Sequence, residues 1–381
     1  MSLAEDPSFK VRKAVAEHLV EICKVVAVGT FTSKMFPLYC TLAADTIWGV
    51  RKAAADNIVE MAKLTPLEVR LTVLTKILCA LIQDISQWVQ RAALQRLGEF
   101  IVTLMPSIIP DSLVEAYSTI AVANESEEEE VVYQCAYNFP GVLYACGKAQ
   151  WSKLKNIYFA LWELDFQKVT RTLCCSLHEI AKIVGSEVSS SELLPIFLER
   201  IENINEITLH LLKNAGFLLS FATKEQKENF LDKMQGLYED SGNRWRIREV
   251  IANNVFDYCK NYKPTTIFKN YWPHILSLCG DNVWCVRTCS AKNLWRFLDY
   301  CKEEEFVGLM CSDLICFSTD GKWTMRQVFC IACAEMWRIE NVLLKYFLEP
   351  LTELVGDKVV GVRIAALNAL KEVAKNSGKL I

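Results

Sequence analysis

The 381-residue sequence lacks the features that mark the common enzyme classes. It contains no glycine-rich phosphate loop and no GxSxG or HExxH motif, and its four histidines fall at unrelated positions. No apolar run reaches the roughly 18 residues needed to span a membrane. The net charge of −3 argues against a general nucleic-acid binder, which carries a basic stripe. We therefore expect no catalytic, cofactor or metal site, and neither membrane nor nucleic acid as a partner.

Cysteine is abundant, with sixteen residues. The segment Met1–Lys10 lacks the apolar run of a secretory signal, so we expect reduced thiols in a cytoplasmic or nuclear protein. Cys330 and Cys333 form a CxxC inside a helical stretch, without a second pair or flanking histidines. We interpret them as core residues, with a metal or redox site as the alternative.

A short motif recurs along the whole chain, and 45–55 is its clearest copy, with an Arg six residues after an Asp. With the Arg taken as the reference position, ten copies follow one another at intervals of 37–42 residues. The reference positions are Arg12, Arg51, Gln90, Val132, Thr170, Thr208, Arg248, Arg287, Arg326 and Arg363. Such a period in a helical chain is typical of the two-helix HEAT or armadillo repeat.

Hydrophobic periodicity supports the same alignment of the copies. The residue just before the reference position and the residue seven after it are apolar in all ten copies. Because these positions are eight residues apart, they lie on one face of a helix that begins near the reference position. We predict an all-α solenoid (superhelix) of about ten HEAT-type helical hairpins. We expect it to form a single domain over 1–381 that enters and leaves at partial repeats, as in a fragment or in a chain whose ends expose half-repeats.

The Asp and Arg residues of the motif predict a structural ladder. An Arg near the start of each second helix can form a bidentate bond with the turn Asp of an adjacent copy. A row of partner-binding charges is the alternative interpretation. The predicted ladder consists of Asp6, Arg12, Asp45, Arg51, Asp84, Arg248, Asp281, Arg287, Asp320, Arg326, Asp357 and Arg363. Copies three to six lack the Arg, which leaves the ladder in doubt there.

Tryptophans beside the turns are candidate partner-binding groups, because Trp is enriched at interface hot spots. Packing onto the next copy is the alternative interpretation. A glutamate run replaces the turn in copy four, and such a run is typical of a solvated loop. The candidate protein-binding residues on the turn ridge are Trp48, Trp88, Glu127, Glu128, Glu129, Glu130, Trp245, Trp284 and Trp323.

Three stretches carry a more specific resemblance: 132–140 (VYQCAYNFP), 170–181 (TRTLCCSLHEIA) and 243–248 (NRWRIR). They resemble the scaffold subunit of protein phosphatase 2A and, more closely, regulatory subunit 1 of protein phosphatase 4. The stretch 322–327 (KWTMRQ) adds to the second likeness. The resemblance implies a non-catalytic scaffold that holds a phosphatase catalytic subunit and presents phosphoprotein substrates to it. Since HEAT arrays also build karyopherins, an importin-type nuclear transport receptor that binds a small GTPase is the alternative.

Overall fold

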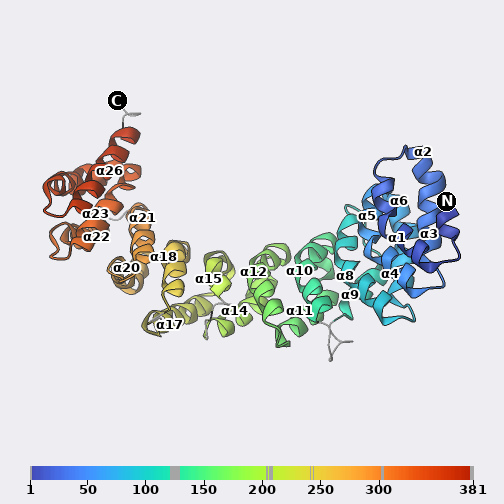
Figure 1. The fold of residues 1–381 in the computed structure, drawn as a ribbon. Helices are drawn as coiled ribbons and strands as arrows, with labels where there is room; N and C mark the ends of the chain where they lie inside the picture. Colours follow the sequence, from blue (N-terminus) through green and yellow to red (C-terminus); the bar gives the residue numbers. More distant parts are fainter. Residues whose placement is uncertain are drawn as a thin grey trace. The chain divides into compact units, whose positions relative to one another are not determined.

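The computed structural model describes residues 2–120, 129–202, 205, 209–240, 242, 244–301 and 304–377. These residues form helices joined by short turns, and no strand occurs among them. Contacts divide the chain into two compact units, Met1–Gly185 (unit 1) and Ser186–Ile381 (unit 2). Each unit is a stack of helical hairpins, which confirms the predicted α-solenoid of HEAT-type repeats (Figure 1). The single domain over 1–381 stays a prediction.

In unit 1 the second helices of consecutive hairpins pack on one another in chain order. They are α1 (Phe9–Cys23), α4 (Trp48–Asp56) continued by α5 (Ile58–Leu64), α8 (Gln87–Thr103), α10 (Glu129–Cys146) and α12 (Gln167–Val184). The first helices are α2 (Val28–Thr30) with α3 (Phe36–Ala43), α6 (Leu67–Val69) with α7 (Thr75–Ile82), α9 (Asp111–Ser118) and α11 (Trp151–Glu163).

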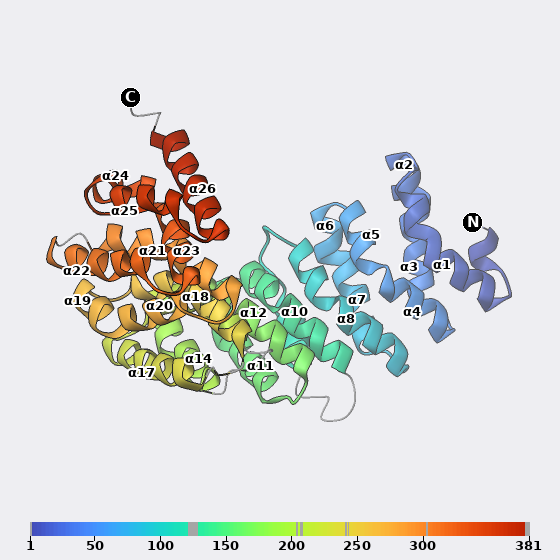
Figure 2. The ribbon, with the colours of Figure 1, turned by 60° about the vertical axis from the view of Figure 1, so that its left-hand side comes forward.

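Unit 2 is likewise built of stacked helical hairpins (Figure 2). Its second helices are α15 (Leu209–Lys213) with α16 (Ala215–Leu218), α18 (Trp245–Cys259), α21 (Trp284–Tyr300), α23 (Trp323–Cys333) and α26 (Val360–Ser377). Its first helices are α13 (Ser186–Val188) with α14 (Leu194–Arg200), α17 (Lys224–Asp240), α19 (Pro264–Thr266) with α20 (Trp272–Cys279), α22 (Glu304–Ile315), and α24 (Glu340–Val342) with α25 (Leu348–Glu353).

Several first helices contain a five-residue π-helical turn followed at once by a proline-bearing segment. Pro37 follows the π turn Phe31–Met35, and Pro273 follows Ile267–Tyr271. Proline has no N–H to donate and its ring crowds the carbonyl four residues earlier, so a wider turn relieves both problems. The helix therefore continues past the proline and does not end there.

The core of each unit lies between first and second helices, where the periodicity predicts it. Among the described residues before the reference position, all are buried except Val11, which is half-buried. Seven residues after that position all are buried except Leu370. No helix of the described chain is long and apolar enough to cross a membrane.

Candidate functional site

Four of the predicted Arg–Asp pairs are present as bidentate bonds between adjacent hairpins. Arg12 donates Nε and Nη2 to the Asp45 carboxylate at 2.7 and 3.0 Å, and Arg51 binds Asp84 at 2.6 and 2.8 Å. The same two-bond contact joins Arg248 to Asp281 and Arg326 to Asp357. Nη1 of Arg51 also donates to the backbone carbonyl of Asp45 in its own turn. Each guanidinium of this kind therefore ties its own turn to the next one.

The carboxylate of the turn Asp also accepts a hydrogen bond from the backbone of its own turn. Oδ1 of Asp45 accepts the backbone N–H of Ile47 at 2.8 Å, and Asp357 accepts that of Val359 at 2.7 Å. The accepted N–H belongs to the residue just before the second helix, so the Asp fixes the turn and does not cap the helix directly. The pKa of Asp45 is lowered, mainly by the hydrogen bond from Arg12. The pKa of Asp357 is lowered in the same way by Arg326.

One predicted Arg–Asp pair of the ladder does not form, and in copy three a Gln replaces the Arg. Arg287 donates Nη1 to the carbonyl of Asp281, yet among the described residues no ion pair joins it to Asp320. Gln90 occupies the reference position of copy three and donates to the carbonyl of Asp84, as an Arg would. Among the described residues, its short amide makes only this bond, which stays within its own turn. The role of the ladder in setting the angle between hairpins stays a prediction.

The tryptophans stand in the first turn of second helices, and four of them are half-exposed. Trp48, Trp88, Trp284 and Trp323 are between 45% and 53% exposed, and Trp245 is half-buried. In unit 1 a groove of about 330 Å³ opens between Trp48 and Trp88. Its other lining residues come from α1 and α4: Lys13, Glu17, Gly49, Lys52, Ala53 and Asp56. Trp48 and Trp88 therefore line a groove whose other residues come from second helices, and their role in binding a partner stays a prediction.

Unit 2 has a corresponding groove of about 500 Å³. Trp284 is one of its lining residues, and α23 and α26 supply most of the others, including Ile331 and Ile364. Gln327 and Ile364 stand one residue after the reference position, as Lys13 and Lys52 do in the unit 1 groove, but the unit 2 groove also includes later helix positions such as Glu335. Each unit thus presents a groove that is lined mainly by second-helix residues and includes at least one indole.

The acidic run lies only partly within the described residues. Glu127 and Glu128 fall outside them, whereas Glu129 and Glu130 form the first turn of α10. Glu130 accepts from Lys168 of α12 at 3.0 Å, and the hydrogen bond from Gln134 is the largest cause that lowers its pKa. Glu130 therefore joins two adjacent second helices and is not part of a free acidic loop.

Most of the cysteines are buried or half-buried, whereas Cys175 and Cys316 are exposed, so the expectation of core residues is wrong for these two. All sixteen are free thiols, and Cys330 and Cys333 of the CxxC are buried on α23. Burial raises the pKa of Cys330 to about 12 and that of Cys333 well above its usual value. Thiols held protonated in this way are poor nucleophiles and poor metal ligands. In the described part of the chain, no group of three His, Cys, Asp or Glu side chains is placed to hold a metal ion.

A row of asparagines was missed by the sequence analysis. Asn57 donates Nδ2 to the carbonyl of Ala16 at 3.1 Å, and Asn293 donates to that of Ala252 at 3.3 Å. Both stand six residues after the reference position and reach the second helix of the preceding copy. Asn recurs at this position in copies two, four, six, seven and eight, and this recurrence is visible in the sequence.

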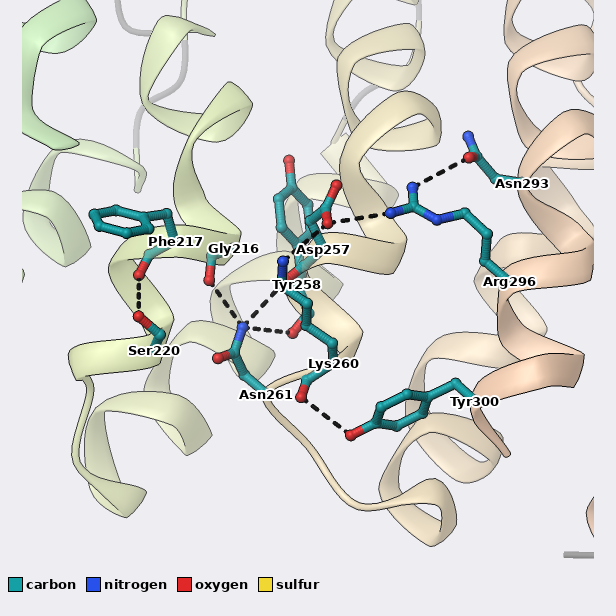
Figure 3. A network of polar contacts seen from close by, with 10 residues as sticks. All are labelled: Gly216, Phe217, Ser220, Asp257, Tyr258, Lys260, Asn261, Asn293, Arg296 and Tyr300. Atoms are coloured by element: carbon teal, nitrogen blue, oxygen red, sulfur yellow. Dashed lines mark hydrogen bonds and ion pairs between the residues drawn. The ribbon is translucent and has the colours of Figure 1, made fainter. Parts of the chain in front are cut away.

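A network of polar contacts ties α16, α18 and α21 together in unit 2 (Figure 3). Asn261 donates Nδ2 to the carbonyl of Gly216 at 2.9 Å, and Tyr300 donates its hydroxyl to the carbonyl of Lys260 at 3.1 Å. Arg296 of α21 reaches the carboxylate of Asp257 at 3.3 Å. The contact at Gly216 is a close approach of two backbones, since a Cβ there would lie 2.3 Å from the Asp257 carbonyl oxygen.

These surfaces belong to a chain whose likeness to known proteins is specific. The family model described as the protein phosphatase 4 regulatory subunit 1 middle domain matches residues 135–237. The human serine/threonine-protein phosphatase 4 regulatory subunit 1 is 26% identical over 281 residues, which cover 71% of this chain and 30% of the human protein. The chain resembles regulatory subunit 1 of protein phosphatase 4. It spans about 30% of the length of this curated relative. The likeness to the scaffold of protein phosphatase 2A stays a prediction.

Two solved structures give only weak likenesses. The crystal structure of an engineered protein has a TM-score of 0.48 at 15% identity and covers 98% of this chain and 97% of its own. A structure of Kap95p bound to RanGDP has a TM-score of 0.48 at 12% identity, covering 98% of this chain and 43% of its own. Neither contributes to the functional argument.

Proposed function

We propose that the chain is a non-catalytic regulatory or scaffold subunit of a protein Ser/Thr phosphatase similar to protein phosphatase 4. It binds the catalytic subunit and presents phosphoprotein substrates, in the cytoplasm, the nucleus or both. The similarity to protein phosphatase 4 regulatory subunit 1 carries this proposal, because it extends over 71% of the chain. It favours a phosphatase partner over the small GTPase of an importin-type receptor.

The second-helix face supports binding by contact. Half-exposed Trp48 and Trp88 line one groove, and half-exposed Trp284 lines another. An indole in this state still has apolar area for a partner to cover, and Trp residues that become fully covered contribute strongly to affinity. Glu129, Glu130, Trp245 and Trp323 remain candidates for further contacts.

The partner itself is the first thing to test. We expect the tagged chain, expressed in cells, to co-purify with a Ser/Thr phosphatase catalytic subunit, identified by mass spectrometry. The purified chain alone should not hydrolyse a phosphopeptide with or without added Mn²⁺. Recovery of a small GTPase in place of the catalytic subunit would favour the importin-type alternative, and turnover by the homogeneous chain would contradict the proposal.

Trp48→Ala and Trp88→Ala test where the partner binds. We expect each to weaken binding of the purified catalytic subunit about tenfold or more, as hot-spot truncations do. The melting temperature should change little, because both indoles are about half-exposed. The measurement is biolayer interferometry combined with a thermal melt.

Ile85→Ala is the matched control for these variants. Ile85 is fully exposed on the turn between α7 and α8, so it reports on docking at the turn ridge. If Ile85→Ala weakens binding while both Trp variants bind normally, the partner lies on the turns and the groove is not the interface.

A further inference from the structure

The groove between Trp48 and Trp88 in unit 1 carries two hydrogen-bond donors that the described chain leaves unused. Trp48 and Trp88 stand in the first turns of α4 and α8, and they are 48% and 53% exposed. Neither indole N–H has a hydrogen-bond acceptor among the described residues. Because an indole N–H is a donor only, a partner that covers these rings has to bring an acceptor for each of them.

The acids that line the same groove are already paired. Glu17 lies 3.4 Å from the Lys13 ammonium, and Asp56 lies 2.7 Å from that of Lys52. Each pair joins positions i and i+4 of one helix, where the two charges neutralise each other. The groove wall therefore has no unpaired carboxylate that could accept hydrogen bonds from a partner, and its charges sum to zero.

Two further cations stand on the same helices, but neither of them lines the groove. Arg91 lies over the Trp88 ring, with its guanidinium carbon 4.9 Å from the ring centre. Lys10 is exposed one turn before Lys13 on α1. The groove wall itself therefore favours an uncharged segment over an acidic or a basic one.

The shape of the groove sets a spacing for what it binds. Its lining includes Gly49 and Ala53, two of the smallest residues, which leave it open. Helices α4 and α8 pack on one another, and packed helices have axes about 8–10 Å apart. A polyproline II helix advances about 9 Å in each turn of three residues. Residues three apart in such a segment therefore recur at about the spacing of the two helices that carry the indoles.

We propose that this groove binds a proline-rich segment of a partner protein in the polyproline II conformation. Proline has no N–H, so such a segment brings carbonyl acceptors with few donors, and aromatic-lined grooves bind its rings. An extended strand would bring N–H groups for which the groove wall has no free carboxylate, and an α-helix would use its carbonyls internally. In the complex each indole N–H donates to a carbonyl of the segment.

The inference deepens the proposed function and rests on it in one respect, that Trp48 and Trp88 face a protein partner. The two can fail separately, because binding of a peptide to the purified chain involves no phosphatase. Peptide binding without co-purification of a catalytic subunit would support this inference and contradict the proposed function. Co-purification without peptide binding would overturn this inference alone.

The test measures fluorescence anisotropy of a fluorescein-labelled peptide of about 12 residues, with proline at every third position and serine between. We expect it to bind the purified full chain, with little change on addition of salt, because the groove wall is neutral. Trp48→Ala and Trp88→Ala should each weaken binding about tenfold. Trp48→Phe and Trp88→Phe keep a ring but remove the donor, so each should weaken binding about fivefold.

Tyr144→Ala is the matched control, since Tyr144 is an aromatic residue of α10 that is 64% exposed and does not line the groove. This variant should bind the peptide within about twofold of the parent chain. A peptide with proline at every fourth position loses the match in spacing, so it should bind about fivefold more weakly. A peptide with serine in place of every proline should not bind.

Binding of the serine peptide as tight as that of the proline peptide would overturn the proposal, as would equal weakening by Tyr144→Ala. So would tighter binding of a glutamate-rich peptide of the same length, which would assign the groove to an acidic segment. Full-strength binding by both Phe variants would also contradict it, because the indole N–H groups would then not be used. Thermal melts by circular dichroism should be unchanged for every variant, so that a loss of binding is not a loss of folding.

Discussion

Replacing Gly216 by alanine should destabilise unit 2 by about 1–3 kcal/mol, although alanine favours helices. The added Cβ would lie 2.3 Å from the carbonyl oxygen of Asp257 and 2.8 Å from its Cβ. Backbone atoms of α18 cannot rotate away as a flexible side chain can, so α16 and α18 must move apart. The hydrogen bond from Asn261 to the Gly216 carbonyl would be strained at the same time (Figure 3).

Gly236→Ala provides the control for this effect. Gly236 lies within α17, and a Cβ there would meet nothing within 4 Å. That substitution should stabilise by up to about 1 kcal/mol, through helix propensity alone. Thermal melts of both variants by circular dichroism make the comparison. Equal gains in melting temperature for the two variants would show that α16 and α18 do not approach this closely in solution.

Repetition is what made the fold predictable from the sequence. Val50 and Ile58, for example, stand at the two apolar positions that recur in every copy, and both are fully buried. Such residues are constrained by a local period that ten copies display independently. The bidentate partner of Arg51 could be anticipated for the same reason, because Asp84 occupies the same motif position one copy later.

Contacts that depend on the exact separation of two helices could not be predicted in this way. Arg287 and Asp320 stand at the same motif positions as Arg51 and Asp84, yet no bond joins them within the described chain. The close approach of the α18 backbone to Gly216 could not be predicted from the sequence either, because a glycine does not identify the segment that packs against it. The spacing of the tryptophans is compatible with both packing and docking. The half-exposed state of Trp48 and Trp88 in a groove wall depends on how the neighbouring helices pack.

Removing the guanidinium of Arg326 should cost about 1.5–3 kcal/mol, the range for hydrogen bonds to charged groups. The side chains of Arg326 and Asp357 are each only 7% exposed, so this pair is shielded from water more than an ordinary surface pair. Arg326→Met keeps the aliphatic volume and leaves the Asp357 carboxylate with the Val359 N–H but without two donors.

Arg363→Met is the matched control for the ladder. Arg363 occupies the same motif position and donates to the carbonyl of Asp357 at 2.7 Å, just as Arg326 donates to that of Asp320. Arg363 has no carboxylate bond among the described residues, so its loss should cost less than about 1 kcal/mol. The difference between the two variants therefore isolates the bidentate step, measured by urea denaturation followed by circular dichroism.

The pH dependence of the Arg326→Met effect provides an independent test of the ion pair. Arg326 lowers the pKa of Asp357, so between that lowered pKa and the unfolded value near 3.9 the unfolded chain binds more protons than the folded one. The stabilisation is therefore fully present above about pH 4 and is lost as the pH falls through the folded pKa. We expect the stability gap between the parent chain and Arg326→Met to be constant from neutral pH to about pH 5 and to shrink below about pH 4. A gap that stays the same down to the acid transition would show that Arg326 contributes through packing and not through its bond to Asp357.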